Sequence, residues 1–143
     1  MLIKSNSKEF TEDLGARFAK KLAGTEIIQF YGELGAGKTT FIRGLANGLS
    51  VKDPKVVTSP TYNIINIYKG KFYIYHWDMY RINSEEELFD TGFFDYIGNG
   101  ITLIEWSENI EDFIPKKYPT IKVKITYSGK NTRNFDFFGI EHF

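Results

Sequence analysis

The stretch GELGAGKTT, residues 32–40, constrains the fold of this 143-residue chain more than any other feature. It follows the short apolar run TEIIQFY and precedes FIRGLANGL, whose apolar residues recur at helical spacing. The stretch matches the P-loop pattern G-x-x-x-x-G-K-[ST], in which a glycine-rich loop joins a buried strand to a helix. The chain is therefore expected to hold a phosphate group where a strand ends and a helix begins.

Each residue type in this loop has a physical reason. Glycines permit positive φ and let backbone N–H groups surround phosphate oxygens without a Cβ in the way. Lys38 is expected to reach the β- and γ-phosphates as a point charge, and the Thr39 hydroxyl is expected to bind Mg²⁺. The predicted phosphate-holding residues are Gly32, Glu33, Leu34, Gly35, Ala36, Gly37, Lys38, Thr39 and Thr40.

The pattern of the remaining chain predicts two early helices. Asn6 or Ser7 is expected to cap an amphipathic helix that ends near Gly24. A second helix is expected over Thr39–Leu49, directly after the loop.

The predicted strands fall into two kinds. TEIIQFY and ITLIEW are short apolar runs typical of buried parallel strands. VVTSPTYNIINIY and KFYIYHWDMY predict two strands joined by a tight turn at Gly70, and TIKVKITY with RNFDFF predicts a pair at the sheet edge. We therefore expect residues 1–143 to form a single α/β domain. It should be a P-loop NTPase-like three-layer sandwich with a mixed sheet, parallel core strands and antiparallel C-terminal strands.

Composition excludes several classes of function. Lysine and arginine together equal aspartate and glutamate, which gives a formal net charge of zero, so attraction to a polyanion is not expected to drive binding. The chain has no cysteine, which excludes disulfides, thiolate metal sites and cysteine nucleophiles. No apolar signal core or membrane-length apolar run occurs, and we expect a cytoplasmic protein.

The charge is unevenly distributed along the chain. Residues 82–115 contain nine acids and no lysine or arginine, whereas residues 116–143 contain six basic residues and two acids. The acidic segment is interpreted either as a solvated face or as a docking surface for a basic partner.

A P-loop enzyme also needs a carboxylate near its metal ion, usually at the end of a neighbouring apolar strand. Asp78 ends FYIYHWD, and Glu105 follows the apolar residues of ITLIEW. Spacing alone does not separate these two acids, and either is able to bind Mg²⁺ or to position the attacking water. A strand-end cap is a third interpretation of each. His76, in the same aromatic run as Asp78, is assigned to packing.

The stretch TSPTYNI, residues 58–64, lies between the P-loop helix and Asp78. A Ser-Pro-Thr turn that points a hydroxyl towards the γ-phosphate would act as a switch ordered by triphosphate. An ordinary proline turn before a strand explains the same residues, so Thr61 and Tyr62 need support from another line of evidence.

Taken together, GELGAGKTT, TSPTY, YHWDMYR and LIEWSE resemble the motifs of the TsaE family, formerly called YjeE. These are small bacterial P-loop ATPases needed for the threonylcarbamoyladenosine modification of tRNA. The similarity runs from the first helix to about Pro115, and the order and spacing of four motifs make it specific. Ser107 stands where a proline is common in the family.

The resemblance implies that the nucleotide is ATP and the metal is Mg²⁺. It implies that Glu105, rather than Asp78, joins Thr39 at the magnesium site. Asp78 would then be a catalytic or γ-phosphate-sensing acid alongside Thr61.

The resemblance also indicates contacts outside the P-loop. Trp106 matches a family tryptophan close to the nucleotide. Base contacts in such proteins come from the start of the first helix and from the C-terminal strands, which by position indicates Ser7 and Arg133. The implied partners are the TsaD and TsaB proteins of the threonylcarbamoyl-transferase complex, which would bring this chain to tRNA indirectly. ATP hydrolysis would reset that complex between turnovers, and the acidic segment would be its docking face.

Three alternatives share the P-loop. A small-molecule or nucleoside kinase needs a lid with arginines, yet after the P-loop helix no arginine occurs before Arg81. A GTPase would carry an N-K-x-D stretch, which this sequence lacks. A regulatory module that binds nucleotide with negligible turnover is compatible with every motif.

Overall fold

The computed structural model describes residues 1–32, 36–61 and 63–143. Within these residues, a seven-stranded mixed sheet has the order β1-β7-β6-β2-β5-β4-β3. The strands run Leu2–Ser5 (β1), Ile27–Gly32 (β2), Ile65–Lys69 (β3), Tyr73–Asp78 (β4), Ile101–Glu105 (β5), Thr120–Gly129 (β6) and Thr132–Phe138 (β7). The helices run Lys8–Ala19 (α1), Ala36–Gly48 (α2), Glu85–Asp90 (α3) and Phe93–Tyr96 (α4), with 3-10 turns at Pro54–Val56 (η1), Ser107–Asn109 (η2) and Glu111–Phe113 (η3).

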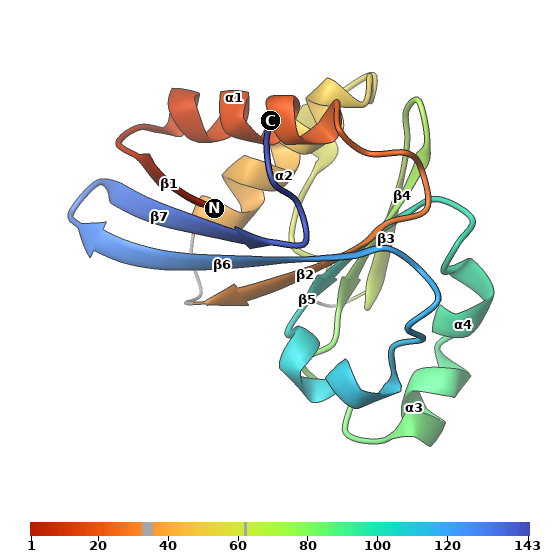
Figure 1. Cartoon of the computed structure of the whole chain (residues 1–143). Coiled ribbons are helices and arrows are strands. Elements are labelled where there is room, and N and C mark those ends of the chain that lie inside the picture. The colour runs from red at the N-terminus through yellow and green to blue at the C-terminus, as the bar shows by residue number, and fades with distance from the viewer. Residues whose placement is uncertain (33–35, 62) are drawn as a thin grey trace.

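Helices α1 and α2 lie on one face of the sheet, and α3 and α4 lie on the other (Figure 1). Strands β6, β2, β5 and β4 are parallel neighbours, whereas β7 and β1 continue the sheet antiparallel at one side and β3 pairs antiparallel with β4 at the other. The predicted three-layer α/β fold, with parallel core strands and antiparallel C-terminal strands, is confirmed.

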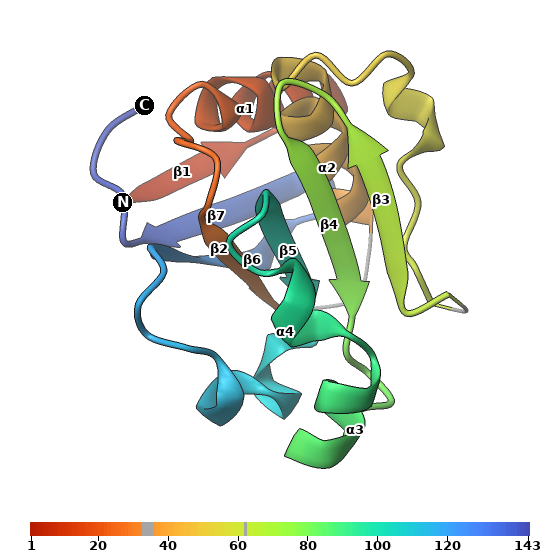
Figure 2. The same cartoon turned by 90° about the vertical axis from the view of Figure 1, so that its right-hand side faces the viewer.

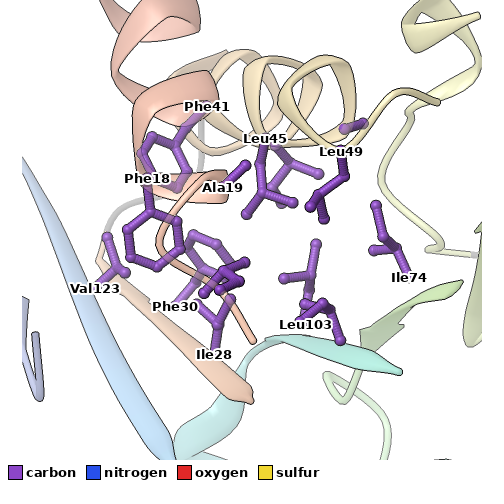
Figure 3. Packing of buried hydrophobic residues seen from close by; sticks show 14 of the residues in the cluster. Phe18, Ala19, Ile28, Phe30, Phe41, Leu45, Leu49, Ile74, Leu103 and Val123 are labelled. Carbon is purple, nitrogen blue, oxygen red and sulfur yellow. The ribbon is translucent and has the colours of Figure 1, made fainter. Parts of the chain in front are cut away.

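The larger core lies between the sheet and the two long helices. Helix α1 contributes Phe18, helix α2 contributes Phe41 and Leu45, and strand β2 contributes Ile28 and Phe30, all of them fully buried (Figure 3). The aromatic rings pack edge-on and tilted, with centroids 5.5 Å apart for Phe18 and Phe41. This core fixes the start of α2 against the end of β2, where the P-loop begins.

Two glycines allow the helices to approach closely. A Cβ on Gly15 of α1 would lie 2.2 Å from the Phe41 carbonyl oxygen. A Cβ on Gly44 of α2 would lie 2.0 Å from the Glu12 carbonyl oxygen. The helix backbones therefore touch at a distance that only glycine permits.

The second core lies on the opposite face, beneath α3, α4 and η2 (Figure 2). Trp77 and Ile104 come from the sheet, and Phe93 packs edge-on to Trp77 at 5.3 Å between ring centroids. Alternate residues of β4 and β5 thus fill the two cores, since neighbouring side chains in a strand point to opposite faces.

The first helix and its surroundings differ from the sequence prediction. Strand β1 was not predicted. Ser7 is the N-cap of α1 and accepts a hydrogen bond from the Phe10 backbone N–H. The helix ends at Ala19 rather than near Gly24, because the following N–H groups bond three residues back instead of four.

The other boundaries also shift. Helix α2 begins at Ala36, three residues before the predicted start. The predicted strand over residues 56–68 is wrong in its first half, because β3 begins only at Ile65. Pro60 has no N–H to donate to a ladder, and Ile64 adopts φ 67°, so neither residue continues a strand. No helix within the described ranges is long and apolar enough to cross a membrane.

Candidate functional site

The predicted site residues gather at the carboxyl edge of the parallel strands. Gly32 ends β2, Glu105 ends β5 and Asp78 ends β4. Strand β5 lies between β2 and β4, and Glu105 is in register with Asp78. Glu105 is therefore one strand from the P-loop, and Asp78 is two strands away. In open α/β sheets, ligands bind outside this edge.

The glycines at the two ends of the P-loop have different roles. Gly32 has φ +124°, and a Cβ there would lie 2.0 Å from the Ile125 carbonyl oxygen, so packing requires glycine. A Cβ on Gly37 would meet only ordinary contacts, 3.6 Å from an Ile125 carbon and 3.8 Å from Arg133. The fold itself tolerates a side chain at Gly37, and the open space there suits the approach of a ligand. Glu33, Leu34 and Gly35 lie outside the described residues, as does the predicted candidate Tyr62.

Lys38 lies in the first turn of α2 and is only 4% exposed. Its Nζ lies 5.8 Å from the centre of the Trp106 ring. Within residues 1–32, 36–61 and 63–143, no carboxylate lies within salt-bridge distance of Nζ. A buried cation without a paired anion is unfavourable, and a bound phosphate supplies such an anion.

Glu105 is the most strongly held acid of the site. The Nε2 atom of His76 lies 2.6 Å from its Oε2 atom, and the Ser59 hydroxyl donates to the same oxygen at 3.4 Å. Burial alone would raise the pKa of Glu105. The hydrogen bond and attraction from His76, with the charge of Lys38, outweigh burial and hold that pKa below its usual value of 4.5.

Asp78 makes a different contact. Its Oδ1 atom accepts a hydrogen bond from the Tyr80 backbone N–H at 2.9 Å, which caps the turn after β4. This is the strand-end cap that the sequence left open as one interpretation, and no donor in the described part of the chain bonds the other carboxylate oxygen.

The residues before β3 contact Glu105. The Thr61 hydroxyl donates to Ser59 at 3.4 Å, and Ser59 in turn contacts Glu105. Both bonds are long for hydroxyl donors and therefore weak. The structure thus brings the predicted switch segment to Glu105, through Ser59 rather than through Thr61 directly.

A pocket of about 250 Å³ opens beside the start of α2. Gly37 and Thr40 line it from α2, Ser7 lines it from the start of α1, and Arg133 lines it from β7. The Arg133 guanidinium also stacks on Tyr127, 4.0 Å from the ring centre. The two residues assigned to base contacts by position, Ser7 and Arg133, therefore lie in one pocket adjoining the P-loop.

Trp106 occupies a constrained position. It follows Glu105 directly and has φ 60°, which is uncommon for a residue other than glycine. Its ring centre lies 5.8 Å from the Lys38 Nζ atom and 4.8 Å from the centre of the Tyr80 ring. The left-handed backbone turns the indole back over the P-loop lysine.

The donors present fit Mg²⁺ bound together with a nucleotide. Within the described residues, no three histidine, aspartate or glutamate side chains cluster closely enough to hold a metal ion without further ligands. Mg²⁺ is usually bound by one or two protein groups, several waters and substrate phosphates. The Thr39 hydroxyl and the Glu105 carboxylate are groups of this kind.

Comparison with known proteins identifies the family. A family model described as "Threonylcarbamoyl adenosine biosynthesis protein TsaE" matches residues 5–135. The chain belongs to the TsaE family.

Two relatives and one solved structure show the extent of the similarity. The tRNA threonylcarbamoyladenosine biosynthesis protein TsaE of Rickettsia prowazekii (strain Madrid E) is 40% identical over 129 residues, covering 90% of this chain and 88% of that protein. The protein of the same name from Aquifex aeolicus (strain VF5) is 43% identical over 105 residues, covering 71% and 73%. The crystal structure of Bacillus subtilis YdiB superposes with a TM-score of 0.69 at 29% identity, covering 96% of this chain and 83% of that one.

Sequence reasoning missed two residues at this TsaE-family site. His76 was assigned to packing, yet it bonds Glu105. Alternation carried a signal, because His76 and Asp78 share one face of β4 while Trp77, between them, packs in the core beneath α3 and α4. Ser59 lies in the predicted Ser-Pro-Thr turn, but its contact with Glu105 was not predicted, since that contact depends on how the turn at Pro60 folds back.

Proposed function

We propose that this TsaE-family chain binds ATP with Mg²⁺ at the carboxyl edge of its sheet and hydrolyses it. One observation carries the proposal: a buried Lys38, without a carboxylate partner among the described residues, stands at the start of α2 beside an ionised Glu105. A cation and an anion held apart in this way suit a phosphate and a metal ion bound between them.

The residue roles follow from position. Lys38 binds the β- and γ-phosphates, and the N–H groups at the start of α2 point at them. Thr39 and Glu105 hold Mg²⁺, which when bound offsets negative charge on the phosphates. Asp78 and Thr61 orient the attacking water or sense the γ-phosphate, and the pocket with Ser7 and Arg133 receives the base.

Function in the cell follows from the relatives, which are named for tRNA threonylcarbamoyladenosine biosynthesis. We place this chain in the same process, in which ATP hydrolysis supports a TsaD–TsaB threonylcarbamoyl-transferase complex that modifies adenosine 37 of tRNA. The zero net charge suits a protein that reaches tRNA through protein partners rather than by itself.

The acidic segment offers a surface for such a partner. Phe89 of α3 is 69% exposed, and it lines a hollow together with Phe94, Glu85 and Glu86. An exposed aromatic anchor with acidic neighbours is suited to a basic surface that carries an apolar residue.

The test of the proposed function is ATP hydrolysis by the purified chain, alone and with TsaD and TsaB added. We expect slow turnover alone, faster turnover with the partners, and less with GTP in place of ATP. Nucleotide binding without turnover under every condition would instead indicate a regulatory module. Phosphate transfer to a small molecule would indicate a kinase.

Glu105→Ala tests whether Glu105 or Asp78 binds the metal ion. We expect it to reduce magnesium-dependent hydrolysis more than ATP binding, because the lost carboxylate acts on the metal ion. Asp78→Ala, measured beside it, serves as the comparison. Unchanged hydrolysis in Glu105→Ala would return the metal role to Asp78.

The docking surface is tested by binding of the chain to the TsaD–TsaB complex in solution. Phe89→Ala should weaken binding, whereas Phe138→Ala, which alters a half-exposed phenylalanine on β7, should not. Equal binding by the two variants would show that the partner docks elsewhere.

A further inference from the structure

His76 belongs to a buried chain of polar contacts that reaches from the carboxylate of Glu105 to the backbone before Pro60. Its Nε2 atom lies 2.6 Å from Glu105 Oε2, and its Nδ1 atom lies 3.2 Å from the Tyr68 hydroxyl. That hydroxyl also donates to the Thr58 carbonyl oxygen at 3.2 Å. His76 is 1% exposed and Tyr68 is 5% exposed, so water does not replace these contacts.

The contacts of Glu105 leave one carboxylate oxygen available. His76 and Ser59 both bond Oε2, and no donor within the described residues bonds Oε1. The 2.6 Å separation between Nε2 and Oε2 is that of a hydrogen bond in which the ring nitrogen donates and the carboxylate oxygen accepts. The short bond from His76 therefore restrains Oε2, and the other oxygen is left for a separate partner.

The imidazole ring is itself fixed from the opposite side. Strand β3 lies next to β4, and its Tyr68 holds Nδ1 while packing in the larger core. The Glu105 carboxylate at Nε2 and the Tyr68 hydroxyl at Nδ1 together set the orientation of the ring. The ring therefore acts as a rigid spacer between β3 and the end of β5.

We propose that His76 is a positioning residue for Glu105, and that Tyr68 couples this pair to the segment that begins at Thr58. The proposal rests on the proposed function of Glu105 at the magnesium site. In metal sites, residues that orient a ligand without touching the metal typically change metal affinity about 10–100-fold when they are replaced.

These contacts connect the segment before β3 to Glu105 at the proposed metal site. Asn66 also donates to the Thr58 carbonyl, at 3.1 Å, and Arg43 of α2 donates to the Val57 carbonyl at 3.3 Å. Thr58 is thus held by Tyr68, which also bonds His76, and by Asn66 on the same strand. Movement of this segment changes the support of the ring, and the ring transmits that change to Glu105.

The first experiment measures Mn²⁺ affinity in the presence of ADP by electron paramagnetic resonance. His76→Phe keeps a ring of similar size without a donor, and we expect the Mn²⁺ dissociation constant to rise about 10–100-fold. His76→Gln keeps an N–H donor at the position of Nε2 and should restore most of the affinity. Tyr68→Phe should have a smaller effect in the same direction. ADP affinity without metal should change less than about twofold in all three variants.

The second experiment uses no metal or nucleotide. The chain has two histidines, and His142 is exposed, so the His76 ring signals are readily assigned by nuclear magnetic resonance. We expect a slowly exchanging Nε2–H proton with a downfield shift, which moves upfield in Glu105→Gln. Tyr68→Phe should speed its exchange with water.

The outcomes distinguish the two proposals. Equal Mn²⁺ affinity in Glu105→Gln and the unaltered chain would overturn the metal role of Glu105, and the ring signals would then decide the His76 contact. Unchanged Mn²⁺ affinity in His76→Phe, with weakened affinity in Glu105→Gln, would overturn the positioning role. A His76 Nε2–H signal insensitive to Glu105→Gln would overturn the contact itself.

Discussion

Lys38 is a buried lysine whose environment makes its role directly testable. Its ammonium has no carboxylate partner among the described residues, and it lies against the Trp106 ring. Any anion bound at the start of α2 meets this charge first.

We predict that Lys38→Ala weakens ATP binding by about 10–100-fold, measured by calorimetry. A hydrogen bond to a charged group contributes about 1.5–3 kcal/mol, and each tenfold change corresponds to 1.4 kcal/mol. Lys52→Ala removes an exposed lysine after α2 and serves as the control. Tight ATP binding by Lys38→Ala would contradict the P-loop assignment.

Tyr31 is a second residue with an altered environment. Burial raises the pKa of Tyr31 to about 12, the Ser107 hydrogen bond opposes this, and the bond and charge of Glu111 add to it. The Tyr31 hydroxyl donates to Glu111 at 3.1 Å. A pKa raised on folding means that the unfolded chain loses its proton first as pH rises.

We predict that the contribution of Tyr31 to the free energy of unfolding is constant below pH 10, the ordinary tyrosine pKa. That contribution should fall as pH rises from 10 towards 12. The free energy of unfolding should drop more between pH 9 and about 11 in the unaltered chain than in Tyr31→Phe. An identical drop in both would show that Tyr31 titrates as an ordinary tyrosine.

For individual residues, linear spacing predicted the phosphate-loop residues and both candidate acids, and the structure places Gly32, Asp78 and Glu105 at one edge of the sheet. The P-loop pattern is local, since one strand, one loop and one helix bring its residues together. The contact between His76 and Glu105 depends on the pairing of β4 with β5, and the support from Tyr68 depends on β3. Spacing along one chain does not specify such cross-strand neighbours.

The packing of α1 against α2 leaves no space for an added side chain at the glycines where the two helices meet. Gly44 faces the α1 backbone so closely that a Cβ would overlap the Glu12 carbonyl oxygen. Backbone atoms cannot move aside as a flexible side chain does, so the whole helix must shift.

We predict that Gly44→Ala lowers the free energy of unfolding by about 1–3 kcal/mol, measured by urea denaturation. This loss should appear although alanine favours an exposed helix by about 1 kcal/mol over glycine. Gly129→Ala, where the nearest atom is 3.6 Å from the added Cβ, should change stability by less than about 0.5 kcal/mol. Equal stability of both variants would mean that the helices lie further apart.

Most elements were predictable because their patterns are local. The strands β2 and β5 are continuous apolar runs, and β6 alternates. Strand β1 was missed because LIKS is four residues long and its pairing with β7 joins opposite ends of the chain. The start of β3 was misplaced because β-branched residues before Pro60 favour a strand by composition, while the proline and the left-handed Ile64 end it.

The whole molecule shares one sheet between two cores. Strands β4 and β5 contribute alternate side chains to the larger core and to the smaller one beneath α3 and α4. Unfolding of these strands therefore exposes both cores together.

We predict that ATP with Mg²⁺ stabilises both cores equally. At about 100 times the dissociation constant, ligand binding adds about 2.7 kcal/mol, which corresponds to about 100-fold slower global opening. Hydrogen exchange at the backbone amides of Phe18 and Trp77, one in each core, should slow by the same factor. Slowing of Phe18 without Trp77 would show that the smaller core opens independently.

The two tryptophans occupy different environments, so we expect them to contribute separately to the intrinsic fluorescence of the protein. Trp77 is fully buried among aromatic rings, so its emission stays at short wavelength while the sheet is intact. Trp106 is partly exposed and contacts Lys38 and Tyr80, so we expect its emission at longer wavelength and expect it to change when charge arrives at the phosphate loop. One indole is thus a built-in optical probe of the site, and the other is its internal reference for the folded state.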